Sequence, residues 1–283
     1  MPGLRAGHTD RNRAEEPSMI MMSDDGPVAI VTFENPPMGF MNMEMVKELD
    51  RIVAAYEADD NVRAIVFTGG LPNVFIRHYD VGEIVQAGEF VRQSGRSADD
   101  IAEAARAETD IARLFDRVDR MGKPTIAAIN GMCMGGGFEF ALCCDIRIAA
   151  PGPYTIGLPE TNVGIFPGAG GTQRLPRAVG EARALELILR GRVLSPEEAA
   201  QLGMVHWVET HDLLQAAINV GKDLARKAPA ALAAAKRLVK GAMDRPLADG
   251  LAEERAAFMR LLVEDDDSMA RMQAFLDGDG EIA

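Results

Sequence analysis

The stretch Asn130–Asp145, NGMCMGGGFEFALCCD, decides how the rest of the sequence is interpreted. Three consecutive glycines, Gly135–Gly137, interrupt an apolar run, and glycine weakens helices and strands, so these residues need a local reason. We expect a ligand to approach the free N–H groups at the start of a helix. Glu139 follows among apolar residues, where an acid usually has a partner or a catalytic role. The alternative is a glycine-rich packing contact with Glu139 in solvent.

Composition narrows the class of protein. The chain has 283 residues with 47% hydrophobic residues, enough for one large domain, or one domain with an appendage, around a full core. Its formal net charge of −13 argues against nucleic acid and anionic membranes as partners. No apolar run is long enough to span a membrane. Three cysteines, two of them adjacent, fit neither a disulfide framework nor a metal site. We therefore expect buried thiols, no metal, and a cytoplasmic protein.

Periodicity predicts an α/β chain. An apolar strand at 28–33, a helix capped by Asn42 and a second strand at 64–70 indicate a parallel crossover. The charged segment 85–110 favours a helical, mobile flap. We expect a poorly ordered tail over 1–25, an α/β core over 26–211, and a helical oligomerisation region over 212–283.

A second informative stretch lies at 154–180. Glu160 follows Pro159 where a predicted strand gives way to a loop. The segment PGAGGTQRL, residues 167–175, is a glycine-rich turn that leads into a helix. It lacks the lysine of a phosphate loop and the GxGxxG spacing, so tight packing at a helix start is favoured over nucleotide binding.

Together these stretches supply the parts of an acyl-chemistry site. Glu139 and Glu160 each follow a predicted strand and a Gly or Pro turn, as an acid–base pair requires. The turns around Tyr79 and Gly136 end two strands of one sheet, where backbone N–H groups could form an oxyanion hole. On these residues alone, an accidental arrangement in an α/β enzyme remains an equal alternative.

Four motifs in fixed order carry a resemblance to a known family. They are TGG with F-x-x-x-x-D at 68–80, KPTIAAINGMCMGGGFEFALCCDIRIA at 123–149, LPETNVGIFPGAGGTQRLPRAVG at 158–180, and SPEEAAQLGMV at 195–205. In them the chain resembles the crotonase superfamily, the enoyl-CoA hydratase/isomerase family, over about residues 28–276. The resemblance implies the crotonase (ClpP-like) α/β fold, in which repeated ββα units form a two-sheet spiral core with a C-terminal helical region. It also implies homotrimers, or hexamers built as dimers of trimers.

Carried over by position, the resemblance implies a lyase of fatty acid metabolism, an enoyl-CoA hydratase. The peptide N–H groups of Tyr79 and Gly136 would hold the thioester oxygen of an acyl-CoA substrate. Glu139 would activate water and Glu160 would protonate Cα in a syn addition across a 2-enoyl-CoA double bond. No cofactor is implied beyond the coenzyme A of the substrate. The residues expected to bind substrate are Arg77, His78, Gly135, Pro159 and Gly168.

The sequence departs from the family at the first oxyanion turn. His78 stands where relatives usually have glycine, and a side chain there would be costly if φ were positive. Tyr79 replaces a small residue, so its ring is expected to reshape the acyl pocket. Asp80 is retained, and we expect it to cap the following helix.

A second departure concerns coenzyme A. Val81–Gly82 stands where relatives often have a lysine, which removes an expected partner of the ADP phosphates. Arg77, Lys123 or a neighbouring subunit could replace it. Alternatively, the substrate is a different carbonyl compound, used by an isomerase or by a C–C hydrolase that cleaves CoA-free β-diketones. A non-catalytic scaffold or RNA-binding member is a third interpretation, opposed by the two glutamates and the negative charge.

Overall fold

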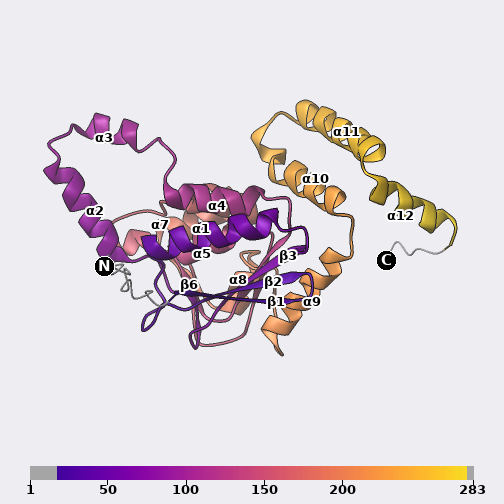
Figure 1. Ribbon diagram of the computed structural model, residues 1–283. Coiled ribbons are helices and arrows are strands. Elements are labelled where there is room, and N and C mark those ends of the chain that lie inside the picture. The colour runs from indigo at the N-terminus through magenta and orange to yellow at the C-terminus, as the bar shows by residue number, and fades with distance from the viewer. Residues whose placement is uncertain (1–17, 279–283) are drawn as a thin grey trace, which may run out of the picture.

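Two β-sheets form the framework of the computed structural model, which describes residues 18–278 (Figure 1). The larger sheet has the strand order β1 (Ile20–Asp25), β2 (Val28–Phe33), β3 (Ala64–Gly69), β5 (Thr125–Ile129), β7 (Ile146–Ala149) and β10 (Trp207–Val208). The smaller sheet contains β4 (Val74–Ile76), β6 (Met132–Met134), β8 (Ile156–Gly157) and β9 (Val193–Leu194). Only the β1–β2 and β8–β9 pairs of these sheets are antiparallel.

The chain alternates between the sheets. β3, β5 and β7 of the larger sheet are followed by β4, β6 and β8 of the smaller one, and a helical segment comes next each time. Asn130 helps to fix one such passage, because its side chain donates to Gly69 O at 2.7 Å and accepts from Gly69 N at 3.0 Å. This confirms the predicted spiral of ββα units.

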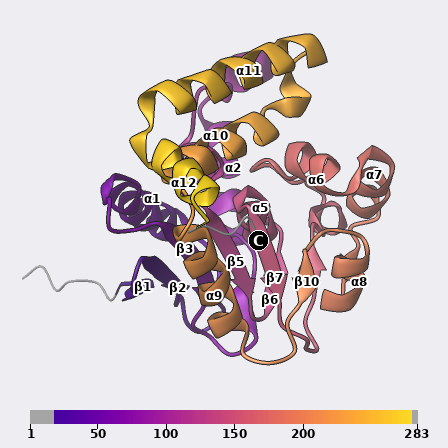
Figure 2. The ribbon, with the colours of Figure 1, turned by 90° about the vertical axis from the view of Figure 1, so that its right-hand side faces the viewer.

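Helices surround the sheets. The first half of the chain contributes α1 (Met43–Ala58), α2 (Val81–Gln93), α3 (Ala98–Ala104), α4 (Asp110–Arg120) and α5 (Gly136–Cys143). The second half contributes η1 (Glu160–Val163), α6 (Gly171–Val179), α7 (Glu181–Leu189), α8 (Pro196–Gln201), α9 (Leu213–Ala225), α10 (Pro229–Lys240), η2 (Ala242–Asp244), α11 (Leu247–Glu264) and α12 (Asp266–Leu276). α9 packs on the larger sheet, whereas α10–α12 stand above it as a separate layer (Figure 2).

The core fixes the position of α5. Phe140 of this helix meets Phe67 of β3 edge-on at 5.0 Å between ring centroids, and Phe33 of β2 at 5.6 Å. Every residue of α5 is buried. Because packed interiors resist displacement, the N-terminus of α5 is held firmly beside the smaller sheet.

Local sequence signals correctly place several helix starts. Asn42, Asp80 and Ser195 each cap a helix through a side-chain oxygen, and Ser195 forms a capping box with Glu198. All three cysteines are buried free thiols, as predicted.

One boundary is wrong. The predicted tail over 1–25 includes Ile20–Asp25, but these residues form β1 and pair with β2. Residues 1–17 lie outside the described chain. The sequence of β1, IMMSDD, does not alternate between apolar and polar residues, so it carries no strand pattern of its own, and this edge strand is recognised only through its partner.

Two helical segments project from the core. α2 and α3 contain no buried residue and extend away from the sheets, which confirms that residues 85–110 are largely helical and lie outside the core (Figure 1). α10–α12 lie at the other end of the molecule. Within residues 18–278, no helix is long and apolar enough to cross a membrane. The mobility of the flap and the role of 212–283 in oligomerisation stay predictions.

Candidate active site

A parallel bridge fixes the backbone around Tyr79. Met41 N–H donates to His78 O at 2.9 Å, and Asp80 N–H donates to Met41 O at 2.8 Å. In a parallel bridge the residue between these two bonds directs its own N–H to the opposite side. In the described chain, the Tyr79 N–H has no acceptor among backbone or side-chain groups.

His78 supports this turn. Its Nδ1 lies 2.8 Å from Tyr79 O, and because a carbonyl only accepts, Nδ1 carries the hydrogen. The ring also packs on Phe40, with 4.5 Å between centroids. Among residues 18–278, only Asn73 combines a side chain with positive φ, so His78 avoids the strain that a glycine position suggested.

Gly136 brings the second N–H group to the same place. It is the first residue of α5, and an added Cβ would lie 3.0 Å from Tyr79 Cβ and 3.4 Å from Tyr79 N. Gly135 precedes it with φ of 50° and donates to Gly157 O at 2.9 Å. The Gly136 N–H has no acceptor within the described residues, as expected for the first amide of a helix. Two free donors therefore lie side by side.

Glu139 lies one helical turn beyond, with 3% exposure. Its Oε1 accepts hydrogen bonds from Ala169 N and Gly171 N, both at 2.8 Å. Burial raises the pKa of Glu139, and the two backbone donors partly offset this effect. A side chain at position 171 would crowd the carboxylate, because an added Cβ on Gly171 would lie 3.0 Å from Glu139 Oε1.

Glu160 has a different environment. It starts η1 directly after Pro159, and both carboxyl oxygens are buried without a hydrogen-bond partner from another described residue. Burial raises the pKa of Glu160 to about 7, its own N–H opposes the rise, and the charge of Glu139 adds to it. An added Cβ on Gly135 would lie 3.4 Å from Glu160 Oε1, so the carboxyl adjoins the glycine turn.

The structure thus brings most predicted site residues together. The backbone of Arg77 is fixed next to the turn around Tyr79. Its N–H donates to Gly39 O at 2.8 Å, and its carbonyl accepts from Met134 N at 3.2 Å. Gly168 is exposed and lines a separate cavity between α6 and α10. Lys123, one of the alternative cations for the phosphates, has other partners within the described residues, because its Nζ donates to Tyr56 O and Asp59 O at the end of α1.

Sequence reasoning missed the donors that hold Glu139. Ala169 and Gly171 belong to the glycine-rich turn 167–175, for which the sequence predicts tight packing at a helix start and a substrate contact at Gly168, but no role in binding Glu139. The available signal was the buried acid itself, since a buried carboxylate requires donors and a glycine-rich loop exposes them.

Comparison with known proteins places the chain in a family. The family model described as enoyl-CoA hydratase/isomerase matches residues 24–278. The short-chain-enoyl-CoA hydratase of Clostridium acetobutylicum is 32% identical over 260 residues, covering 91% of this chain and 94% of that protein. The mitochondrial methylglutaconyl-CoA hydratase of Rattus norvegicus is 36% identical over 227 residues, covering 78% and 68%.

Solved structures agree with this assignment. The crystal structure of the enoyl-CoA hydratase from Bacillus anthracis superposes with a TM-score of 0.79 and 31% identity, over 92% of this chain and 97% of that one. The family resemblance and fold predicted from the motifs are confirmed. The chain belongs to the enoyl-CoA hydratase/isomerase family.

Proposed function

We propose that the protein hydrates a 2-enoyl-CoA thioester, with Glu139 and Glu160 as its acid–base pair and Tyr79 and Gly136 as its oxyanion donors. The enoyl-CoA hydratase-like function predicted from the sequence is confirmed by the relatives. The residue roles are our proposal. The observation that carries them is the pair of free N–H groups beside two glutamates in unequal environments.

The two amides polarise the substrate. With the thioester oxygen between the N–H groups of Tyr79 and Gly136, the Cβ atom becomes electrophilic. Addition of water then moves negative charge onto that oxygen as an enolate. Donors that are already oriented stabilise this charge without reorganisation, and removal of one such donor costs about 10²–10³ in rate in other enzymes.

The environments of the glutamates assign their roles. Two N–H donors on Glu139 favour its ionised form, so Glu139 is the base that takes a proton from water. The Glu160 carboxyl receives no hydrogen bond from another described residue, and its pKa of about 7 leaves a large protonated fraction at neutral pH. Glu160 is therefore the acid that delivers a proton to Cα. Its two unpartnered oxygens leave room for water and substrate as partners.

Substrate contacts complete the proposal. Gly135, His78 and Pro159 adjoin the glutamates and amides, and Arg77 lies on the same turn as a cation for the coenzyme A portion. Gly168 contributes through the loop that holds Glu139. The reaction needs no cofactor besides the coenzyme A of the substrate.

Assembly and location also belong to this proposal. Apolar side chains exposed on α10–α12, such as Leu247 and Val263, suit packing against other copies in a homotrimer or hexamer. The buried free thiols suit the reducing cytoplasm.

A second candidate is a CoA-free C–C hydrolase. It uses the same oxyanion chemistry on a β-diketone, and the missing lysine at Val81–Gly82 favours it, together with the net charge of −13. Isothermal calorimetry with acetoacetyl-CoA separates the two functions. Micromolar binding that weakens with salt, followed by hydration of crotonyl-CoA, supports the hydratase. Absence of binding at low and moderate salt, with cleavage of a cyclic β-diketone, contradicts it.

A further inference from the structure

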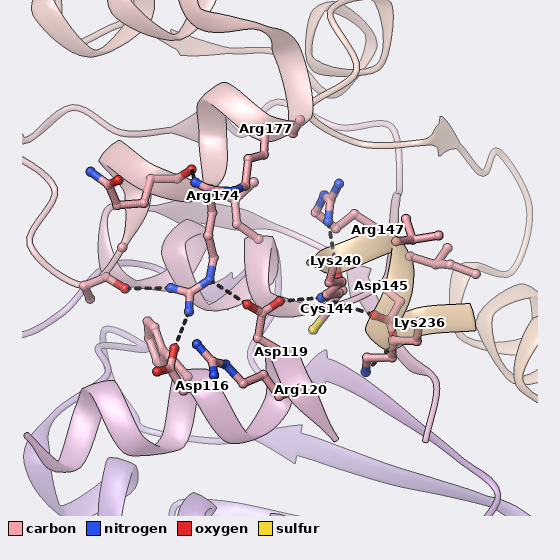
Figure 3. A pocket seen from close by; sticks show the side chains of 18 of the residues that line it. Asp116, Asp119, Arg120, Cys144, Asp145, Arg147, Arg174, Arg177, Lys236 and Lys240 are labelled. Carbon is pink, nitrogen blue, oxygen red and sulfur yellow. Dashed lines mark hydrogen bonds and ion pairs between the residues drawn. The ribbon is translucent and has the colours of Figure 1, made fainter. Parts of the chain in front are cut away.

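A cavity of about 1070 Å³ lies behind the loop that holds Glu139, between α4, α6 and α10 (Figure 3). Its lining contains several ion pairs. At its centre Arg174 of α6 points from the glycine-rich turn toward α4, while Lys240 of α10 approaches from the other side. The cavity therefore borders the loop that holds Glu139, but neither Glu139 nor Glu160 lines it.

Arg174 makes three directed contacts there. Its Nη2 lies 2.8 Å from Asp116 Oδ1, and its Nε lies 3.3 Å from Asp119 Oδ2. Its Nη1 donates to Ala169 O at 3.2 Å. The side chain is only 17% exposed, so its contacts are largely shielded from water. A planar guanidinium bound at three points has little freedom to turn.

Ala169 links this guanidinium to Glu139. The N–H of Ala169 donates to Glu139 Oε1, while its carbonyl accepts from Arg174. Gly170, the next residue, has φ of 111°, and a Cβ there would collide with Nη1 of Arg174. The loop is thus held between the carboxylate on one side and the guanidinium on the other.

Asp119, the residue of α4 that contacts Arg174 Nε, is itself held in place. Asp119 Oδ1 pairs with Lys240, whose Nζ also donates to Cys143 O at 2.8 Å at the end of α5. The helix that carries Glu139 and the loop that binds its carboxyl are therefore joined through Asp119. The second acid, Asp116, pairs with Arg174 alone among the described residues.

We propose that Arg174 is a positioning residue that acts on Glu139 through Ala169, an inference that rests on the proposed function of Glu139 as the base. Loss of its guanidinium frees the 169–171 loop and turns the two donors away from Oε1. Misplacement of a catalytic group by about 1 Å is enough to lower a rate by about 10²-fold. The positive charge of Arg174 also lowers the pKa of Glu139, so the residue affects both geometry and ionisation.

The experiment compares Arg174→Met with Arg177→Met. Arg177 lies one turn later on α6, lines the same cavity and pairs with Asp244, but it does not contact the 169–171 loop. For Arg174→Met we expect kcat for crotonyl-CoA to fall by about 10–100-fold with KM changed by less than about threefold. Arg177→Met should keep both constants.

The pH profile separates positioning from general stability. Without the positive charge, the acidic limb of the kcat profile should move to higher pH, because Glu139 must lose its proton to act. Arg174→Lys keeps the positive charge but loses the planar guanidinium. The acidic limb of its kcat profile should therefore lie close to that of the parent protein, while kcat stays reduced. Equal kcat and an unmoved limb in folded Arg174→Met would overturn the proposal. So would equal losses in Arg174→Met and Arg177→Met.

A titration of Glu139 by NMR tests the link to Arg174 without enzymatic turnover, so it remains informative if the proposed function is wrong. The ¹³C signal of the Glu139 carboxyl, identified by its loss in Glu139→Gln, is titrated in the parent protein, Arg174→Met and Arg174→Lys. A higher titration midpoint in Arg174→Met alone supports the link between the two side chains, even if no enoyl-CoA is hydrated. Identical midpoints in all three proteins contradict it. If Arg174→Met does not fold, Arg174→Lys and Asp116→Asn take its place, because each retains some of the contacts around Arg174. An unchanged kcat in both variants would then overturn the proposal.

Discussion

Replacement of Glu160 by glutamine should stabilise the protein while it removes the acid. Burial raises the pKa of Glu160 from its ordinary 4.5 to about 7, so the folded state holds a proton that the unfolded chain releases. Stability from this group is therefore present below the unfolded pKa and decreases as pH rises through about 7. The gap corresponds to about 3 kcal/mol, at about 1.4 kcal/mol for each pH unit. Because Glu160 keeps some solvent contact, we expect about 1–2 kcal/mol.

The assay is urea unfolding of the parent protein and Glu160→Gln at fixed protein concentration, near pH 4, below the unfolded pKa, and near pH 8. Glutamine mimics the protonated acid, so the two proteins should have similar free energies of unfolding at the lower pH. At the higher pH the variant should be more stable by the amount above. Glu89→Gln on the exposed helix α2 is the matched control, because the Glu89 side chain forms no hydrogen bond or ion pair with another described residue, and it should show no such pH-dependent gain. A variant that is less stable than the parent at the higher pH, or changed equally at both pH values, would refute the claim that burial without hydrogen-bond donors from other residues raises the pKa of Glu160.

Three further outcomes follow from the same geometry. Gly136→Ala places a Cβ 3.0 Å from Tyr79 Cβ, so the two amides must separate, and kcat should fall by about 10²-fold with an unchanged circular dichroism spectrum; full activity would mean that the amides do not act together. Tyr79→Phe removes the hydrogen bond from Tyr79 Oη to Glu83 Oε2 at 2.6 Å, and should lower the free energy of unfolding by about 1 kcal/mol in urea titration; a neutral result would show that this bond adds nothing. The basic limb of kcat/KM should lie near pH 7, because Glu160 must be protonated to act; a limb far above that value would exclude it as the acid.

The fold was accessible from the sequence because its signals are local. Strands with β-branched residues, the cap at Asn42 and the capping box at Ser195 each depend on neighbours within a few positions. The order of four motifs then selected one arrangement of these elements. β1 escaped detection because an edge strand is defined by a partner, here β2, more than by its own pattern.

The site was accessible only in part. Glu139 and Glu160 stood out as acids in apolar or turn surroundings, and glycines marked the close approach at Gly136. The difference between the environments of the two glutamates could not be predicted. It depends on the backbone donors of Ala169 and Gly171, which lie far along the chain from Glu139. The same holds for Lys123, whose acceptors are the last carbonyls of α1, which adjoin it only after folding.

Hydration of crotonyl-CoA by the parent protein, Glu139→Gln, Glu160→Gln and the double variant tests the central claim most directly. We predict that each single variant lowers kcat by about 10²–10⁴-fold, that the double variant loses little more than the worse single one because the two carboxyls act as a unit, and that all four proteins stay folded. A folded Glu139→Gln or Glu160→Gln variant that keeps kcat within about threefold of the parent would contradict the assignment of these two glutamates as the acid–base pair.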